Sequence, residues 1–189
     1  MRRKDRGGGV SFRLENIGRF LNQLGSDSGS PGGGSAAALT AALGIALAEM
    51  VVRINVKGKP AGRKSKAARL KALRQRMELV MDKDAAAFSA LSRFYKTKDR
   101  GARYQAALKK AAEVPFVICE TVPEALRLAE SEAASTGRWL MSDLVESKTL
   151  LKAAFDAGKL NVEINLNALA DKRVAAAAKK RLAALEKTL

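Results

Sequence analysis

The chain has 189 residues and a formal net charge of +16, from 35 lysines and arginines against 19 acidic residues. Histidine is absent and Cys119 is the only cysteine, which excludes histidine metal ligands, catalytic imidazoles, internal disulfides and cysteine-rich zinc sites. The large positive charge indicates a polyanionic partner, a negatively charged surface or unusual solubility needs, and it carries no information about the fold.

The composition predicts one helical domain. Alanine and leucine dominate, while β-branched and aromatic residues are sparse, which favours helices over strands. Residues 1–10 are basic and are followed by no long apolar stretch, so we expect a flexible arm rather than a signal peptide, with the helical domain at 11–189. A lone thiol suits a reducing compartment, and we expect a cytoplasmic protein.

Helical spacing of the apolar residues predicts six or seven helices in chain order. The first covers residues 12–24, and the next covers 35–56 after a glycine-rich loop. The later helices are expected over 63–96, 102–134, 142–158 and from Asp171 to the C-terminus. Pro115 and Pro123 are expected to kink or break the helix at 102–134.

Cap and turn signals bound these helices. The predicted breaks lie at Gly58, Pro60, Gly62 and Gly158. Thr121 with Glu124, and Asp143 with Glu146, each match the spacing of a capping box at a helix start. The segment NVEINL at 161–166 alternates apolar and polar residues. The predicted fold is therefore an all-α, single-domain bundle of six to seven helices with one short extended segment near 161–166.

The segment at 36–52, AAALTAALGIALAEMVV, approaches the length of a membrane span. It contains Thr40 and Glu49, and its alanines and glycine contribute little to insertion, so we interpret it as a buried central helix with no membrane partner. Because such a helix has almost no polar face, it needs neighbours all round. Homo-oligomerisation is one way to supply them.

The stretch SPGGGSAAAL at 30–39 places three glycines directly before that helix. A Walker loop needs a preceding strand and a lysine after the glycines, and neither is present. One interpretation is a plain helix entry with Ser35 as the cap. The other adds that unpaired N–H groups at the helix start attract an anionic ligand. The residues alone leave both open.

A family resemblance rests on these glycines and on five further segments. SPGGGSAAALTAALGIALAEMV resembles the signature of the formiminotransferase-cyclodeaminase C-terminal family, which includes cyclodeaminase domains and stand-alone methenyltetrahydrofolate cyclohydrolases. GRKSK, DKDAAAF, AAEVPF, SDL and NVEINL resemble other motifs of that family in the same order. The resemblance covers about residues 12–185.

The resemblance implies an all-helical, oligomeric enzyme that acts on folates, here expected as a homodimer. A cyclohydrolase adds water to 5,10-methenyltetrahydrofolate and gives 10-formyltetrahydrofolate. A cyclodeaminase closes formiminotetrahydrofolate to the methenyl compound and expels ammonia. Neither reaction needs a metal or a further cofactor. The lack of a fused formiminotransferase domain favours the cyclohydrolase.

Two aspartates are the candidate catalytic residues. Asp84 falls on an apolar helical stripe between Met81 and Phe88, where burial is expected to raise its pKa toward neutrality. A buried aspartate bonded to backbone or lysine is the alternative. Asp143 is the second candidate, although it fits a helix cap equally well. Asp82 is expected at the surface or in a salt bridge.

The candidate substrate-binding residues come from three segments, and they are Gly32, Gly33, Gly34, Ser35, Arg63, Lys64, Asn161 and Asn165. The stretch from Lys57 to Arg76 carries nine basic residues and no acidic one. Such a run is often a solvated face, but under the folate hypothesis Arg63 and Lys64 hold the glutamate tail, which is expected to include polyglutamate. Under a nucleic-acid hypothesis the same run neutralises phosphates. The two asparagines are either substrate-binding or structural amides.

Three departures from the family pattern bear on activity. Lys66 replaces a tyrosine, a proline is missing from FYKTKD, and GRWLM at 137–141 replaces a Gly-Asn pair. A folate cyclohydrolase or cyclodeaminase is the leading hypothesis. The alternatives are an inactive family member that binds nucleic acid or an acidic protein through its basic surface, and a helical oligomer without a ligand.

Overall fold

The structure is a computed structural model that describes residues 11–56, 61–95, 97 and 99–189, without the side chains of Leu14 and residues 61–64. The described residues form six α-helices and three short 3-10 helices, and no strand. The α-helices are α1 (Ile17–Leu24), α2 (Gly33–Asn55), α3 (Ala61–Ser92), α4 (Ala102–Glu130), α5 (Met141–Ala168) and α6 (Lys172–Glu186). The 3-10 helices are η1 (Phe12–Leu14), η2 (Ala133–Ser135) and η3 (Arg138–Leu140). The all-α prediction is confirmed.

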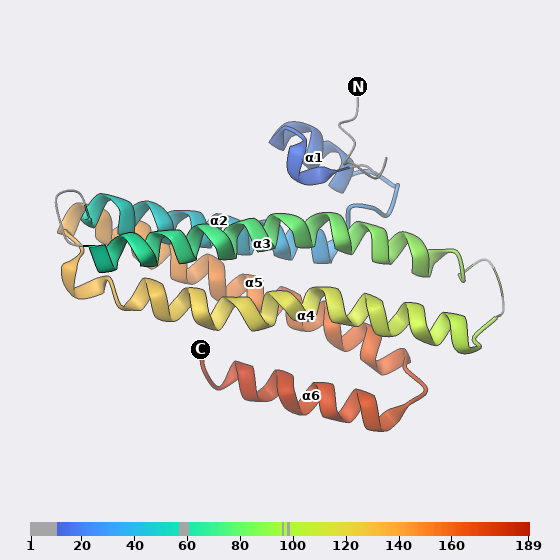
Figure 1. Cartoon of the computed structure of the whole chain (residues 1–189). Helices are drawn as coiled ribbons and strands as arrows, with labels where there is room; N and C mark the ends of the chain where they lie inside the picture. Colours follow the sequence, from blue (N-terminus) through green and yellow to red (C-terminus); the bar gives the residue numbers. More distant parts are fainter. Residues whose placement is uncertain (1–10, 57–60, 96, 98) are drawn as a thin grey trace.

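Four long helices make the bundle (Figure 1). Successive helices from α2 to α5 run in opposite directions. The helix α2 packs between α3 and α5, and α4 closes the ring on the side opposite α2. The helix α6 lies across α4 and α5, and α1 lies on the other side near α2 and α3. The predicted arm at 1–10 lies outside the described residues and stays a prediction.

The helix α2 is the core helix that its composition predicted. Small residues let its neighbours approach closely: a Cβ on Gly44 would lie 3.0 Å from the Ser147 carbonyl oxygen and from Leu151 Cγ. The Ser147 hydroxyl, itself fully buried, donates to the Gly44 carbonyl at 2.7 Å. Within the part of the chain that the structure describes, α2 alone is long and apolar enough to span a membrane. Of its apolar 18-residue stretch, 61% is buried inside the bundle.

One ion-pair cluster joins α2 to α3. The buried Glu49 carboxylate accepts from Arg53 Nε at 2.9 Å and from Arg74 Nε at 3.0 Å. Burial alone would raise the pKa of Glu49, but its hydrogen bonds and charge interactions with both guanidiniums together lower it. The single charge in the apolar segment is therefore paired, as a buried charge must be.

The predicted extended segment at 161–166 is wrong, because these residues lie inside α5. Val162 and Leu166 are buried one turn apart, whereas Leu160 and Ile164 are exposed, so burial follows the helical period and not the alternation. Gly158 does not stop the helix either. It lies inside α5, where a Cβ would come within 3.3 Å of Cys119 Sγ, so its role is close packing on α4.

The predicted caps inside α4 and α5 are also wrong. Thr121 lies within the continuous helix α4 and donates back to the Val117 carbonyl at 2.7 Å. Asp143 is the third residue of α5, whose N-cap position is Leu140. The cap predicted at Asp171 is confirmed, since its carboxylate accepts from the first backbone N–H groups of α6.

Candidate functional site

A pocket of about 260 Å³ opens where α2 begins. The helix α2 starts beside residues 81–84 of α3, and α3, α4 and α5 continue past its first residue (Figure 1). The space ahead of the helix start is therefore bounded by three helices and by the loop that leads into α2. The lining residues are Gly29, Gly32, Gly33, Gly34, Asp84, Ala87, Phe88, Leu91, Tyr95, Ala111, Pro115, Asn161, Ile164 and Asn165.

The glycines let the backbone of the helix start touch side chains of α3 and α5. A Cβ on Gly34 would lie 2.0 Å from Asp84 Oδ1, and a Cβ on Gly33 would lie 3.2 Å from Asn161 Oδ1. Gly29 has a φ of +70°, in the left-handed region that favours glycine. The triple glycine thus serves close approach, and the three glycines predicted as substrate-binding all line the pocket.

Asp84 of α3 supplies the cap that the start of α2 lacks. The N-cap position is Gly32, which has no side chain, so the prediction that Ser35 caps the helix is wrong. Ser35 is a fully buried residue of the first turn, and its hydroxyl donates to Asp84 Oδ2 at 3.1 Å and to the Met81 carbonyl at 3.0 Å. The Asp84 carboxyl therefore lies at the positive end of the α2 dipole.

The surroundings of Asp84 act on its pKa in opposite directions. Burial raises the pKa of this carboxyl, and the hydrogen bonds from the Ser35 hydroxyl and backbone lower it. Burial is the larger effect, so the pKa lies above its ordinary value, as the sequence predicted. A carboxyl in this state binds a proton at higher pH than an exposed aspartate, which suits proton transfer.

Two amides from α5 also line the pocket. Asn161 Nδ2 donates to the Ala157 carbonyl at 2.8 Å, and Asn165 Nδ2 donates to the carbonyls of Asn161 and Ala111 at 2.9 and 3.2 Å. These bonds orient the two amides, with the Asn161 oxygen against Gly33. Asn161 and Asn165 therefore have a structural role in α5 and also line the pocket, and their role in substrate binding stays a prediction.

An aromatic wall comes from the end of α3. The Phe88 and Tyr95 rings pack edge to face with centroids 6.4 Å apart, and both line the pocket while remaining partly exposed. A flat heterocycle can lie against such rings at a pocket mouth. Tyr95 was not among the predicted site residues. Its signal was its place on the same apolar helical stripe as Asp84 and Phe88, and helical spacing alone does not distinguish a pocket residue on that stripe from a core residue.

The remaining predicted site residues lie elsewhere. Asp143 is in the first turn of α5, eighteen residues before Asn161 and so about 27 Å away along the helix. Arg63 and Lys64 belong to the first turn of α3, but their side chains lie outside the described residues. Within one chain, the structure gathers Asp84, the glycines and both asparagines, and it leaves Asp143 at the other end of the bundle.

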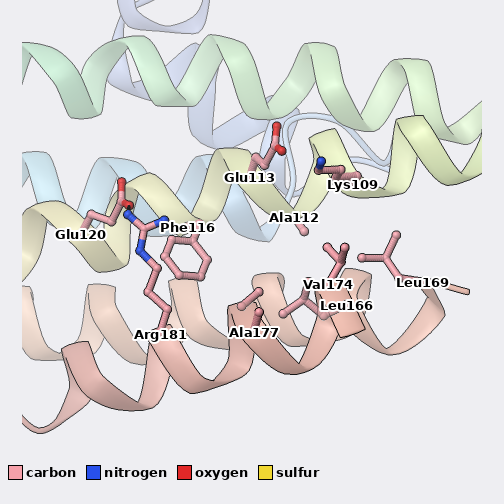
Figure 2. Close-up of a pocket in the computed structure, with 11 residues that line it drawn as sticks. Lys109, Ala112, Glu113, Phe116, Glu120, Leu166, Leu169, Val174, Ala177 and Arg181 are labelled. Atoms are coloured by element: carbon pink, nitrogen blue, oxygen red, sulfur yellow. Dashed lines mark hydrogen bonds and ion pairs between the residues drawn. The ribbon is translucent and has the colours of Figure 1, made fainter. Parts of the chain in front are cut away.

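A separate groove of about 530 Å³, larger than this pocket, lies between α4 and α6 (Figure 2). Its floor is apolar, with Phe116, Leu166 and Val174. At one end Arg181 pairs with Glu120 and lies 5.0 Å from the Phe116 ring centroid. We take the smaller pocket as the candidate site because it combines a helix start, a carboxyl with a raised pKa and two oriented amides.

Comparison with known proteins fits this arrangement. The sequence profile described as formiminotransferase-cyclodeaminase matches residues 16–184. The chain belongs to this family. It is 33% identical over 185 residues to a methenyltetrahydrofolate cyclohydrolase from Methylorubrum extorquens, across 91% of this chain and 88% of that protein.

Two further relatives show how the family varies in length. A formimidoyltransferase-cyclodeaminase from Sus scrofa is 31% identical over 179 residues, which are 88% of this chain and 33% of that protein. The chain therefore spans about a third of the pig protein. The crystal structure of a formiminotetrahydrofolate cyclodeaminase from Thermotoga maritima matches with a TM-score of 0.86 and 25% identity, over 93% of this chain and 90% of that chain.

Proposed function

We propose that this family member is a folate one-carbon enzyme that hydrolyses 5,10-methenyltetrahydrofolate to 10-formyltetrahydrofolate at the α2 pocket. The observation that carries the proposal is Asp84 at the glycine-rich helix start, in a chain that matches 88% of the length of a cyclohydrolase. Cyclodeamination of formiminotetrahydrofolate is the second candidate, because the structural relative from Thermotoga maritima is named as a cyclodeaminase.

The hydrolysis assigns one task to Asp84. Water attacks the methenyl carbon between N5 and N10 and loses a proton to the Asp84 carboxylate. The hydroxyl group now on this carbon then loses the second proton of the former water to solvent as the C=O bond forms and the bond from carbon to N5 breaks, and N5 takes a proton from Asp84. The products are 10-formyltetrahydrofolate and one released proton. A carboxyl that exchanges a proton in both directions needs a pKa closer to neutrality than that of an exposed aspartate.

The other groups of the pocket bind and orient the substrate. The Phe88 and Tyr95 rings offer a surface for the flat pterin, and the Asn161 and Asn165 amides offer polar atoms to its edge. The cationic methenyl group is attracted to the Asp84 carboxylate, and this attraction favours binding with the methenyl carbon next to Asp84.

The test is the near-ultraviolet absorbance of 5,10-methenyltetrahydrofolate in the presence of the protein, corrected for spontaneous hydrolysis. We expect the absorbance to decay faster than the background. We expect the catalysed rate to fall by at least about a hundredfold in Asp84→Asn. A matched control is Asp82→Asn, which changes a carboxylate two residues away that does not line the pocket. Appearance of the same absorbance from formiminotetrahydrofolate, with release of ammonia, would replace hydrolysis by cyclodeamination. The absence of both signals would contradict the proposal.

Three further properties belong to this proposal. The enzyme is a homo-oligomer, a dimer in the simplest case, because the outward side of α2 is apolar. It is cytoplasmic, which suits a single thiol that is fully buried. It accepts polyglutamylated folates through its basic surface, which a lower KM for a pentaglutamate than for a monoglutamate substrate would support. The relatives named above are enzymes, and none is named for nucleic-acid binding.

A further inference from the structure

Ser35 is a fully buried hydroxyl residue in a helix that is otherwise almost without them. The other hydroxyl of α2 belongs to Thr40, which donates at 3.0 Å to the Ala36 carbonyl of its own helix. Ser35 bonds instead across to α3, to Asp84 and to the Met81 carbonyl, forty-nine and forty-six residues away. A buried hydroxyl has to be hydrogen-bonded, and this one finds both of its acceptors on the neighbouring helix.

Ser35 presents two donors to the Asp84 carboxyl. Its backbone N–H and its hydroxyl both bond to this group, and both bonds lower the pKa of Asp84, which burial raises. The hydroxyl lies 3.1 Å from Asp84 Oδ2 and 3.0 Å from the Met81 carbonyl, which belongs to the preceding turn of α3. Because the two acceptors share its one proton, the hydroxyl is anchored to α3 and holds Oδ2 in place.

The other carboxyl oxygen of Asp84 is left for the pocket. A Cβ on Gly34 would lie 2.0 Å from Asp84 Oδ1 and 2.8 Å from Oδ2, so Oδ1 is the oxygen closer to this glycine of the pocket wall. Among the described residues, no side chain donates to Oδ1. The contacts therefore make the two oxygens unequal, and Oδ1 is the one that can exchange a proton with a bound molecule.

No charged side chain among the described residues pairs with Asp84. The charged groups on adjacent turns of α3 and α4 bond to η1 or line a separate groove between these two helices, and they are Asp82, Lys83, Lys110 and Glu113. On α5, Lys159 pairs with Glu186 of α6 and interacts with Glu163, and in the loop before α2 Asp27 is exposed. The other titratable residue that lines the pocket is Tyr95, 55% exposed. Ser35 thus supplies the hydrogen bonds that act on the charge state of Asp84.

We propose that Ser35 is a positioning residue for the reaction at the α2 pocket: its hydroxyl, anchored on the Met81 carbonyl, occupies Asp84 Oδ2 and leaves Oδ1 to exchange the proton with the substrate. The inference rests on the proposed function for its kinetic readout and on the contacts between α2 and α3 for the rest. The proton that moves is the one that Oδ1 takes from water and returns to N5, and the Ser35 proton stays on its hydroxyl. Ser35 therefore acts through Asp84 and bonds to no reacting atom.

The titration of Asp84 tests the bond without any enzyme assay. The carbon-13 signals of the aspartate carboxyls are followed against pH, and the Asp84 signal is the one missing from Asp84→Asn. In Ser35→Ala the carboxylate loses a donor while its burial remains, so Asp84 should titrate at higher pH than in the wild type. Ser147→Ala is the matched control, because it removes another fully buried hydroxyl, which donates to the Gly44 carbonyl instead. Equal titration of Asp84 in Ser35→Ala and the wild type would overturn the proposal.

The pH dependence of folate turnover tests the positioning itself. The acid limb of kcat/KM reports the carboxylate form of Asp84, so it should move to higher pH in Ser35→Ala. Above that limb Asp84 is ionised in both proteins, and we still expect kcat to be about tenfold to a hundredfold lower, the factor that one hydrogen bond to a charged group supplies, with little change in KM. Return of kcat to the wild-type value above the shifted limb, or an equal loss in Ser147→Ala, would overturn the positioning role.

A second variant and the two readouts together separate this inference from the proposed function. Ser35→Cys keeps a side chain of similar size but offers only a weak donor, so both readouts should change in the same direction as in Ser35→Ala. Turnover that is lost in Asp84→Asn but unchanged in both Ser35 variants would keep the proposed function and overturn the role of Ser35. A shifted Asp84 titration in a chain that converts neither folate would instead refute the proposed function and leave the contact between Ser35 and Asp84 standing.

Discussion

Asp82 and Asp84 are two residues apart on α3 and have unrelated tasks. Asp82 Oδ1 accepts from the Phe12 backbone at 2.6 Å, and Oδ2 accepts from the Ser11 hydroxyl at 2.7 Å. Asp82 therefore anchors the segment before α1, which is more than a surface ion pair would do. Asp84 points to the start of α2 instead, because successive helix positions are rotated by 100°.

The raised pKa of Asp84 predicts a pH-dependent stability. The folded chain holds a proton on this carboxyl at pH values where the unfolded chain has released it. The contribution of this carboxyl to stability is therefore greatest below the ordinary aspartate pKa, and it is lost as the pH rises through the raised one. Urea unfolding across this pH range should show the wild type losing stability relative to Asp84→Asn. Parallel pH profiles of the two proteins would contradict the buried state of the carboxyl.

Gly34→Ala tests the contact between the helix start and Asp84. The new methyl would lie 2.0 Å from Asp84 Oδ1, so the carboxyl or the start of α2 must move. We expect a loss of about 1–3 kcal/mol in the free energy of unfolding, together with a loss of folate turnover. Gly25→Ala is the control, since its Cβ meets only the Leu21 carbonyl oxygen at 3.4 Å. Unchanged turnover in Gly34→Ala would separate this contact from activity.

At the scale of elements, local patterns predicted the helices better than their ends. Apolar spacing and, for α2, an almost uniformly apolar composition located all six helices, because each helix buries apolar residues against the bundle. The extended segment predicted at NVEINL was wrong because so short an alternating run is compatible with the period of a strand and with that of a helix. The packing of α5 on α4 decided in favour of the helix. The place of Asp84 on a buried stripe was predictable, whereas its contact with Gly34, fifty residues away, depends on how α2 and α3 align.

Close packing of α2 on α5 supplies an element-scale prediction. Alanine is the better helix former by up to about 1 kcal/mol, so Gly44→Ala would stabilise an isolated α2. In the bundle its methyl would meet the Ser147 carbonyl and Leu151 at 3.0 Å and push the two helices apart. We expect a net loss of about 1–2 kcal/mol by urea unfolding. Gly18→Ala in α1, with its nearest neighbour at 3.7 Å, should instead be neutral or stabilising, and equal behaviour of the two variants would contradict the packing argument.

At the scale of the whole molecule, distant pairs tie the bundle together at both ends. The buried Glu132 carboxylate, after α4, pairs with Lys66 of α3 and accepts from Asn55 Nδ2 of α2 at 3.2 Å. Lys66, the departure from the family tyrosine, thus has a structural partner. At the other end α2 meets Asp84 of α3 and Asn161 of α5. These contacts between remote segments make the helices one cooperative unit.

Cys119 reports on the opening of that unit. Its Sγ is fully buried between α4 and α5, 3.8 Å from the Phe155 carbonyl, and burial raises the pKa of the thiol to about 12. A thiol must be exposed and deprotonated to react, so we expect labelling by a disulfide reagent only through global unfolding, and immediately in urea. A bound folate stabilises the native state by mass action and should slow labelling further in the wild type, and less in Asp84→Asn. Rapid labelling of the native chain would show that α4 and α5 separate locally, and it would contradict a single cooperative bundle.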